Sequence, residues 1–342
     1  RNPHQNWGFK TIVRREAPFA QIGVHRPLEP TGPMPKWTNG SGRQMPEGYL
    51  DKGWRSNRRS WGYDLVTLNH YAIRSIDGFL VKRDRGRTNH INRDQGAAYW
   101  NTHNRNDEVD RSILDRLHLM EPARKRFAED PVLSELHAEA CRWHRERANV
   151  LANEQDARQF LNEVAPDYLA SVQVPPSSVE RPTKPEVVDE GKEKPTPAGF
   201  TPAGDPIHIG TDNEIAFAAL LSRVGDRFPR LERDGIRRPS GNTVIVTSMK
   251  NEGAFILEWI AYHLSIGVSH FLVYTNDCDD PTVAILDRLS ELGYVTRRDN
   301  PFDREAGQEP QRGALNAAWE EQVVRDADWV GVIDVDEFVN VH

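Results

Sequence analysis

The chain has 342 residues, 37% of them hydrophobic and 28% charged, with a formal net charge of −7 and a mean hydropathy of −0.69. The charge is modest and its Lys and Arg residues are dispersed, which excludes a nucleic-acid-binding surface as the main function. No apolar run approaches the roughly 20 residues of a membrane-spanning helix, and two distant cysteines exclude a disulfide framework and favour a reducing compartment.

The first 105 residues are rich in Trp, Gly, Arg and Asn. Three short runs in this zone have strand-like composition, at positions 10–14, 21–25 and 64–70. The chain opens with neither a methionine nor a signal peptide. We therefore expect a piece of a longer protein.

A histidine ends the third of these runs. His70 lies in the pattern His-Tyr-x-x-Arg-Ser, with His25 as the competing histidine, and a lone histidine is more often structural than a ligand. The basic run at 82–87 suits a bound diphosphate, and it also fits a solvated helix end. The sequence leaves both alternatives open.

Residues 106–170 carry helical patterns. Apolar residues at 113, 114 and 117 follow two aspartates, and a longer helix is predicted from Val132 to about Leu151, after a proline suited to the first turn. Residues 172–207 contain eight prolines among Glu, Lys and Ser, a composition that cannot offset the entropy of ordering. We expect a disordered tether there, with a short helix beginning near residue 211.

The last hundred residues alternate strands with helices. Strands are predicted at 244–247, 270–274, 294–296 and 330–333, and helices at 252–266, 282–292 and 314–324. Glycines follow the first two helices, as they commonly do at helix ends. This alternation predicts an α/β fold with a mostly parallel sheet covered on both faces. Ligands of such sheets bind at the carboxyl ends of the strands.

Two carboxylates follow the last predicted strand. Asp334 and Asp336 are spaced i, i+2, so their side chains point to the same side of an extended chain. Mg²⁺ is commonly held by one or two carboxylates together with substrate phosphates. We predict Asp336 as a metal ligand and Asp334 as a holder of a ribose or a metal-bound water. The alternative is a turn in which both residues only cap the backbone.

Further polar groups follow the other strands. Helix N-termini favour anions, but no dinucleotide or P-loop glycine pattern is present. An acidic loop follows the second strand, and an amide and an arginine precede the fourth; for each group the alternative is a plain cap or surface loop. The predicted nucleotide-binding residues are Lys250, Asn251, Glu252, Asn276, Asp277, Gln311, Arg312 and Asp334.

These motifs together resemble a known family. Residues 242–342 look like the N-terminal, nucleotide-sugar-binding half of a family-2-like glycosyltransferase with the GT-A fold and a DxDEF motif. The resemblance rests on Lys250-Asn251-Glu252, the run from Leu257 to His263, Asn276-Asp277, Gln311-x-x-Ala314-x-Asn316, and Asp334 to Phe338.

Residues 1–118 look like the C-terminal half of the same kind of enzyme. Here the resemblance rests on Lys10-x-Ile12-Val13-Arg14, Val24-His25-x-Pro27, Asn69-His70-Tyr71-x-x-Arg74-Ser75 and Phe79-x-x-Lys82. The two halves therefore occur in reversed order, joined by a helical connector at 119–171 and a Pro-rich linker at 172–241. We expect a GT-A-like (Rossmann-like) sheet in the C-terminal part and an α+β N-terminal part.

The resemblance implies sugar transfer from a nucleoside diphosphate sugar to a glycan acceptor, with Mn²⁺ or Mg²⁺ on the diphosphate. It implies metal ligation by Asp334, Asp336 and His70, and a role in polysaccharide biosynthesis. The region that carries the catalytic base in the family has no counterpart here, so no base is named. The implied location is cytoplasmic, or peripheral at the inner membrane, with self-association through the incomplete sheet.

Two rival functions remain. The first is a catalytically inactive nucleotide-binding or assembly module, in one version of which the C-terminal half docks on residues 1–105 and brings Asp336 to His70. The second is a nucleotidyltransferase, which also uses paired carboxylates. That class needs a glycine-rich phosphate loop near residues 247–253, where only Gly253 is present.

Overall fold

The computed structural model describes residues 7–49, 53–86, 95–104, 109, 111–172, 241–305 and 307–342. We call residues 7–172 the N-terminal segment and residues 241–342 the C-terminal segment. Both belong to one compact unit, which joins Arg1–Val174 to Pro239–His342. The predicted tether and the short helix near residue 211 lie outside the described residues, as do Arg87 and Asp107.

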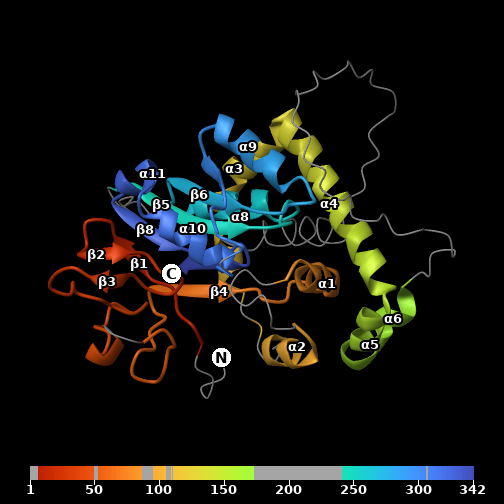
Figure 1. Cartoon of the computed structure of the whole chain (residues 1–342), viewed down its shortest axis with the longest axis horizontal. Coiled ribbons are helices and arrows are strands. Elements are labelled where there is room, and N and C mark those ends of the chain that lie inside the picture. The colour runs from red at the N-terminus through yellow and green to blue at the C-terminus, as the bar shows by residue number, and fades with distance from the viewer. Residues whose placement is uncertain are drawn as a thin grey trace. The chain divides into compact units, whose positions relative to one another are not determined.

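A mixed sheet of five strands forms the centre of this unit, in the order β1-β8-β5-β6-β7 (Figure 1). The four strands β5 to β8 pair in parallel, as the sequence predicts. The strands of the sheet are β1 (Ile12–Arg14), β5 (Thr243–Met249), β6 (His270–Thr275), β7 (Val295–Asp299) and β8 (Trp329–Val332).

The C-terminal segment has four helices, α8 (Ile256–Ser265), α9 (Thr282–Glu291), α10 (Pro310–Ala318) and α11 (Gln322–Arg325). Parallel connections are right-handed, so α8 and α9 cover one face of the sheet and α10 the other. Two predicted boundaries are wrong. The first helix begins at Ile256, because residues 252–255 form a turn. The helix expected at 314–324 is two shorter helices.

Two strands of the N-terminal segment pair with strands of the C-terminal segment. β1 pairs with β8, and β4 (Val66–His70) pairs with β9 (Glu337–Val341), in both cases antiparallel. β9 is absent from the sequence prediction, which treated its first residues as part of a site loop. The strand predicted at 21–25 is displaced: β2 is Phe19–Gln21, and it pairs with β3 (Leu28–Pro30).

Helices make up most of the rest of the N-terminal segment. They are α1 (Ile76–Arg85), α2 (Ala97–His103), α3 (Leu117–Glu129), α4 (Pro131–Ala152), α5 (Gln155–Val164) and α6 (Pro166–Ser171), with 3₁₀ turns at Glu47–Tyr49 and Ser112–Arg116. The long predicted helix is confirmed as α4. It packs against both α1 and α9, and α3 packs against α8.

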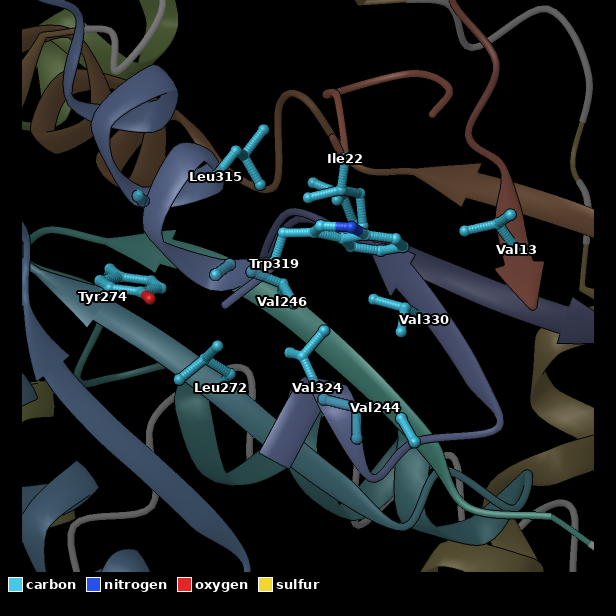
Figure 2. Close-up of a cluster of buried hydrophobic side chains, with 14 of the residues drawn as sticks. Val13, Ile22, Val244, Val246, Leu272, Tyr274, Leu315, Trp319, Val324 and Val330 are labelled. Carbon is cyan, nitrogen blue, oxygen red and sulfur yellow. The ribbon is translucent and has the colours of Figure 1, made fainter. Parts of the chain in front are cut away.

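One hydrophobic core joins the two segments. Val13, Phe19 and Ile22 of the N-terminal segment are buried in the same cluster as the strand residues Val246 and Val330. Figure 2 shows the indole ring of Trp319 over these strands, with Ile22 next to it. The apolar area shared in this cluster stabilises the joined state, at about 25 cal/mol for each Å² removed from water.

Helix α4 contacts the C-terminal segment from its N-cap to His144, and its last turns pack among residues of the N-terminal segment. Its N-cap Asp130 lies 2.7 Å from Arg288 of α9. Further along, Ala140 is so close to Gly253 that a Cβ at that glycine would come within 2.9 Å of the alanine Cβ. The connector is therefore an integral part of the unit.

His263 on α8 is a buried neutral imidazole. Its Nδ1–H donates to the carbonyl of Trp259 (2.9 Å), and its Nε2 accepts the backbone N–H of Val339 in β9 (3.5 Å). Only the neutral ring makes both bonds. Burial lowers the pKa of His263 to about 4, against an ordinary value of 6.5.

This burial predicts acid sensitivity. The unfolded chain binds a proton at His263 near pH 6.5 and the folded chain only near pH 4, so the free energy of unfolding falls as the pH is lowered between these values. The expected loss from this group between pH 7.5 and 4.5 is about 2 to 3 kcal/mol. Urea unfolding of wild type and His263→Gln at both pH values measures it. An equal loss in the two proteins would contradict the assignment.

No helix within the described ranges is both long and apolar enough to cross a membrane.

Candidate active site

The residues after β8 form a tight turn whose backbone carbonyls accept hydrogen bonds from three other residues. The indole N–H of Trp259 donates to the carbonyls of Asp334 and Glu337, at 3.1 and 3.0 Å. Arg74 donates to the carbonyl of Val335 (2.6 Å), and the backbone N–H of Tyr71 donates to that of Asp336 (2.8 Å). All four carbonyls of the turn are therefore bonded, which fixes where its carboxylates lie.

Asp334 lies between two side chains from distant parts of the chain. The ammonium of Lys10 is 3.0 Å from its Oδ2, and the amide of Gln311 donates to its Oδ1 at 3.1 Å. Lys10 also contacts Glu337 at 3.1 Å, and the lysine side chain is only 5% exposed. Burial alone lowers the pKa of Lys10, but the two carboxylates outweigh it and raise this pKa.

Asp336 is paired with two groups of the N-terminal segment. Lys82 of α1 donates to its Oδ2 at 2.7 Å, and the Nε2 of His70 is 3.5 Å from the same oxygen. Burial raises the pKa of Asp336, but Lys82, His70 and Arg74 outweigh it and hold that pKa well below its usual range. The His70–Asp336 contact is the one expected if the two segments dock.

Glu337 behaves differently from its neighbours. Burial and the nearby charge of Asp334 raise its pKa to about 7, although Lys10 opposes them. The Oε2 of Glu337 accepts the backbone N–H of Asp334 (2.9 Å), which closes the turn.

Glu252 forms a second buried ion-pair group. Its carboxylate contacts Arg74 at 3.4 Å and forms a closer pair with Arg85. These three residues, with Lys82 and Asp336, border a cavity of about 20 Å³. That volume accommodates one water molecule. His144 of α4 also borders it, and its Nε2 has no hydrogen-bond partner within the described chain.

The loop after β5 does not offer a free anion site. The backbone N–H of Glu252 donates to Thr282 Oγ1 (2.8 Å) and that of Gly253 donates to Asp280 Oδ2 (2.9 Å). Asn251, at φ 53°, accepts the backbone N–H of Asp279 (2.7 Å). Neighbouring side chains therefore already satisfy the backbone amides of Glu252 and Gly253, and nucleotide contact by Lys250, Asn251 and Glu252 stays a prediction.

The remaining predicted residues also lie near the carboxyl ends of the strands, but they differ in their partners and in their exposure. Asn276 donates to Asp277 (3.2 Å), which also pairs with Arg304, and these contacts lower the pKa of Asp277 against the effect of burial. Arg312 is exposed. Lys250 is half-buried, and its carbonyl accepts from Arg85 (3.1 Å). His25 is stacked on Trp54 and bonded to the Phe9 carbonyl. Burial lowers the pKa of His25, and the charges of Lys10 and Asp334 act on this pKa in opposite directions.

The basic run of α1 is not a solvated helix end. Lys82 and Arg85 are largely buried against Asp336 and Glu252, and Arg83 pairs with Asp156. Sequence reasoning saw this run but could not see the partners of Lys82 and Arg85, which lie 254 and 167 positions away. Lys10 and Trp259 were missed as site residues because their partners are also distant, 324 positions away for Lys10 and 75 and 78 for Trp259.

Four buried polar atoms near the carboxyl ends of the strands have no hydrogen-bond partner among the residues that the structure describes. They are Ser248 Oγ, Tyr274 OH, Asn276 Oδ1 and Gln311 Oε1. Ser248 and Tyr274 pair in register, and Tyr274 packs in the cluster beneath α10, the helix that begins next to Gln311. Buried polar groups without a partner are rare and require explanation. A polar ligand or ordered water would satisfy them.

A divalent cation fits this site only in part. His70 and Asp336 supply one nitrogen and one oxygen close together, but the carboxylate of Asp334 is bonded to Lys10 and Gln311. Across the described ranges no three His, Cys, Asp or Glu side chains converge on a common point. The donor set therefore suits an ion that takes its other ligands from water and a diphosphate, which is the usual environment of Mg²⁺.

The fold and the site define an α/β protein that holds polar groups at the carboxyl ends of parallel strands, where ligands of such sheets bind. Residues 243–341, from β5 to β9, match the model of glycosyltransferase family 92. The match supports a glycosyltransferase, and in this respect the sequence prediction is confirmed. It points to family 92, so the family-2-like assignment is not supported.

The curated relatives agree. A glycosyltransferase family 92 protein of Oryza sativa subsp. japonica is 32% identical over 105 residues, which is 30% of this chain and 17% of the relative. Similar proteins of Ricinus communis and Arabidopsis thaliana are 30% and 33% identical, over 28% of this chain in both cases, and over 17% and 16% of their own lengths. The chain thus aligns with about one sixth of each relative. No solved structure matches.

Proposed function

We propose that the chain forms the donor site of a glycosyltransferase, which moves a sugar from a nucleoside diphosphate sugar to a glycan acceptor. The observation that carries the proposal is the group of unpartnered buried atoms at the carboxyl ends of β5 and β6 and at the start of α10. They lie in the segment that matches family 92. A sugar nucleotide offers hydroxyl and amide groups that would satisfy them.

Different residues of the site would bind different parts of the sugar nucleotide. Gln311 lies between the unpartnered atoms and Asp334. Its Nε2 donates to Asp334, and its Oε1 is one of the unpartnered atoms. Ser248 and Tyr274 would contact the nucleoside. Lys82 and Arg74 bring positive charge to the turn that would face the diphosphate. Such charge, positioned in advance, stabilises a leaving group as its negative charge develops.

We further propose Mn²⁺ or Mg²⁺ as the cofactor, held by Asp336 and His70 together with the diphosphate. A bound divalent cation would neutralise charge on the leaving diphosphate. Asp334 would orient the ribose or a water rather than bind the ion directly, because Lys10 and Gln311 already occupy its oxygens. No catalytic base is assigned.

The proposed domain organisation follows the same logic. Residues 1–118 act as the C-terminal half of a glycosyltransferase-like module and residues 242–342 as the N-terminal half, with the helical connector at 119–171 between them. The pairing of β1 with β8 and of β4 with β9 supports one composite site. A nucleotidyltransferase is disfavoured, because the amides that would bind its phosphates donate to Thr282 and Asp280.

A thermal-shift panel tests the donor site. UDP, GDP, CDP and TDP are each added with and without Mn²⁺. A ligand at 100 times its Kd stabilises the folded state by about 2.7 kcal/mol, so we expect one nucleotide with Mn²⁺ to raise the Tm by several degrees. No shift with any nucleotide, in a chain shown to be folded, would reject the proposed function.

Gln311→Leu and Gln322→Leu form a matched pair for this panel. Gln322 also donates its amide to an aspartate, Asp326 (2.8 Å), but on the exposed surface of α11. We expect the nucleotide shift to be lost in Gln311→Leu and kept in Gln322→Leu. Equal shifts in both variants would remove Gln311 from the site.

A further inference from the structure

The charges at the site are divided between the two segments. Its four carboxylates, Asp334, Asp336, Glu337 and Glu252, all come from the C-terminal segment. Their cationic partners, Lys10, Lys82, Arg74 and Arg85, all come from the N-terminal segment. Each carboxylate thus has a cationic partner before any ligand arrives, so a divalent cation added alone must compete with a lysine or arginine that is already bound.

Lys82 holds the position that such a cation needs. Its ammonium is 2.7 Å from Asp336 Oδ2, the same oxygen that faces His70. A lysine ammonium and a metal ion cannot both occupy this side of one oxygen. Coulomb repulsion between them is also strong where water is largely excluded.

Lys82 is also better able to move than the two arginines of the site. Arg74 is held by the Val335 carbonyl, by Glu252 and by the ring of Phe255 (3.9 Å), and Arg85 by Glu252 and the carbonyl of Lys250. Lys82 has a flexible four-carbon stem and a compact charge. Besides Asp336, it donates to the Ala72 carbonyl at 2.9 Å.

We propose that Lys82 is an exchangeable counter-ion of Asp336, which leaves the carboxylate for the diphosphate when a metal–nucleotide pair binds. This inference rests on the proposed function. Lys82 thereby couples the binding of the two ligands. The metal ion alone binds weakly, because it must displace the Lys82 ammonium from Asp336. The diphosphate favours metal binding, because it offers the displaced ammonium a new anionic partner. Coupling between two ligands is reciprocal, and each strengthens the other by the same factor.

Mn²⁺ titration of the whole chain, followed by the electron paramagnetic resonance signal of free Mn²⁺, tests the exchange without any assay of activity. In wild type we expect UDP or the nucleotide selected by the panel to tighten Mn²⁺ binding at least about tenfold. In Lys82→Met we expect Mn²⁺ alone to bind about tenfold more tightly than in wild type, and the tightening by nucleotide to shrink by a similar factor.

Two variants serve as controls. Lys125→Met removes the same charge from an exposed position, where the lysine contacts Glu129 at 3.7 Å, and we expect wild-type Mn²⁺ binding. Lys82→Arg keeps the charge and is expected to keep weak binding of Mn²⁺ alone. If Lys82→Met fails to fold, the coupling in wild type and the Lys82→Arg titration still decide the question.

Different failures have different meanings. Mn²⁺ binding that is unchanged or weaker in folded Lys82→Met overturns the exchange, and so does the absence of coupling in wild type. A nucleotide that binds with equal coupling in both proteins overturns the exchange but leaves the donor site intact. If no nucleotide binds either protein, the proposed function fails, and the titration of Mn²⁺ alone still decides the role of Lys82.

Discussion

Replacing Asp336 with asparagine is expected to lower the free energy of unfolding by about 3 to 5 kcal/mol, the usual cost of removing one partner of a buried ion pair. Asparagine has nearly the same shape, so the change removes charge and leaves the largely buried Lys82 without its carboxylate. Under the proposed function, transfer activity should fall at least about 100-fold, because even second-shell partners of a metal site are worth 10- to 100-fold. Urea unfolding and a donor-consumption assay measure the two effects.

Asp299→Asn is the matched control. That carboxylate is 91% exposed and pairs with Arg297 on the surface, where such pairs contribute about 0 to 1 kcal/mol. Combining Asp336→Asn with Lys82→Met should restore part of the lost stability, because neither charge is then left alone. If Asp336→Asn kept both wild-type stability and wild-type activity, the carboxylate would have no role in the site.

Trp259→Ala is expected to have the largest effect on stability. The side chain is fully buried, and it packs on Phe271 of β6 with ring centroids 5.2 Å apart. Truncating a buried tryptophan to alanine costs about 3 to 5 kcal/mol. The Glu337 carbonyl also loses the indole donor, at about 1 to 3 kcal/mol for a buried group left unsatisfied, whereas the Asp334 carbonyl keeps the backbone N–H of Glu337 (2.9 Å). Urea unfolding followed by circular dichroism gives the total.

Trp259→Phe separates these two contributions. Phenylalanine keeps most of the apolar volume but has no N–H to donate to the turn. We expect a smaller loss of stability than in Trp259→Ala, together with a clear loss of nucleotide binding, because the turn that carries Asp334 and Asp336 is no longer fixed. Wild-type nucleotide affinity in Trp259→Phe would show that the turn keeps its geometry without the indole.

Local patterns in the sequence were enough to predict the parallel strands. The apolar runs of β5, β6 and β8 and the glycines after α8 and α9 are short-range features, and they appear where expected. The boundary of α8 was misplaced, because the turn before it depends on bonds from Thr282 and Asp280, some 30 positions later. No local pattern contains that information.

The same limit applies to the site. Asp334, Asp336 and Gln311 could be chosen because they follow or precede strands of one sheet. The cationic partners of the two aspartates, Lys10 and Lys82, come from another segment, 324 and 254 positions away. His70 was placed near Asp336 only through a resemblance to a family. β9 was missed because it pairs with β4 rather than with a neighbour in sequence.

The pairing of β1 with β8 and of β4 with β9 has a consequence for the route by which the chain folds. Contacts between residues this far apart make folding slow, because a long loop must close before they contribute stability. The final cost of that closure is small, since each doubling of loop length adds only about 0.6 kcal/mol. During synthesis the N-terminal segment emerges first and must wait, with Val13, Phe19 and Ile22 uncovered, until β8 is made. In this interval the chain is most exposed to aggregation and to binding by chaperones.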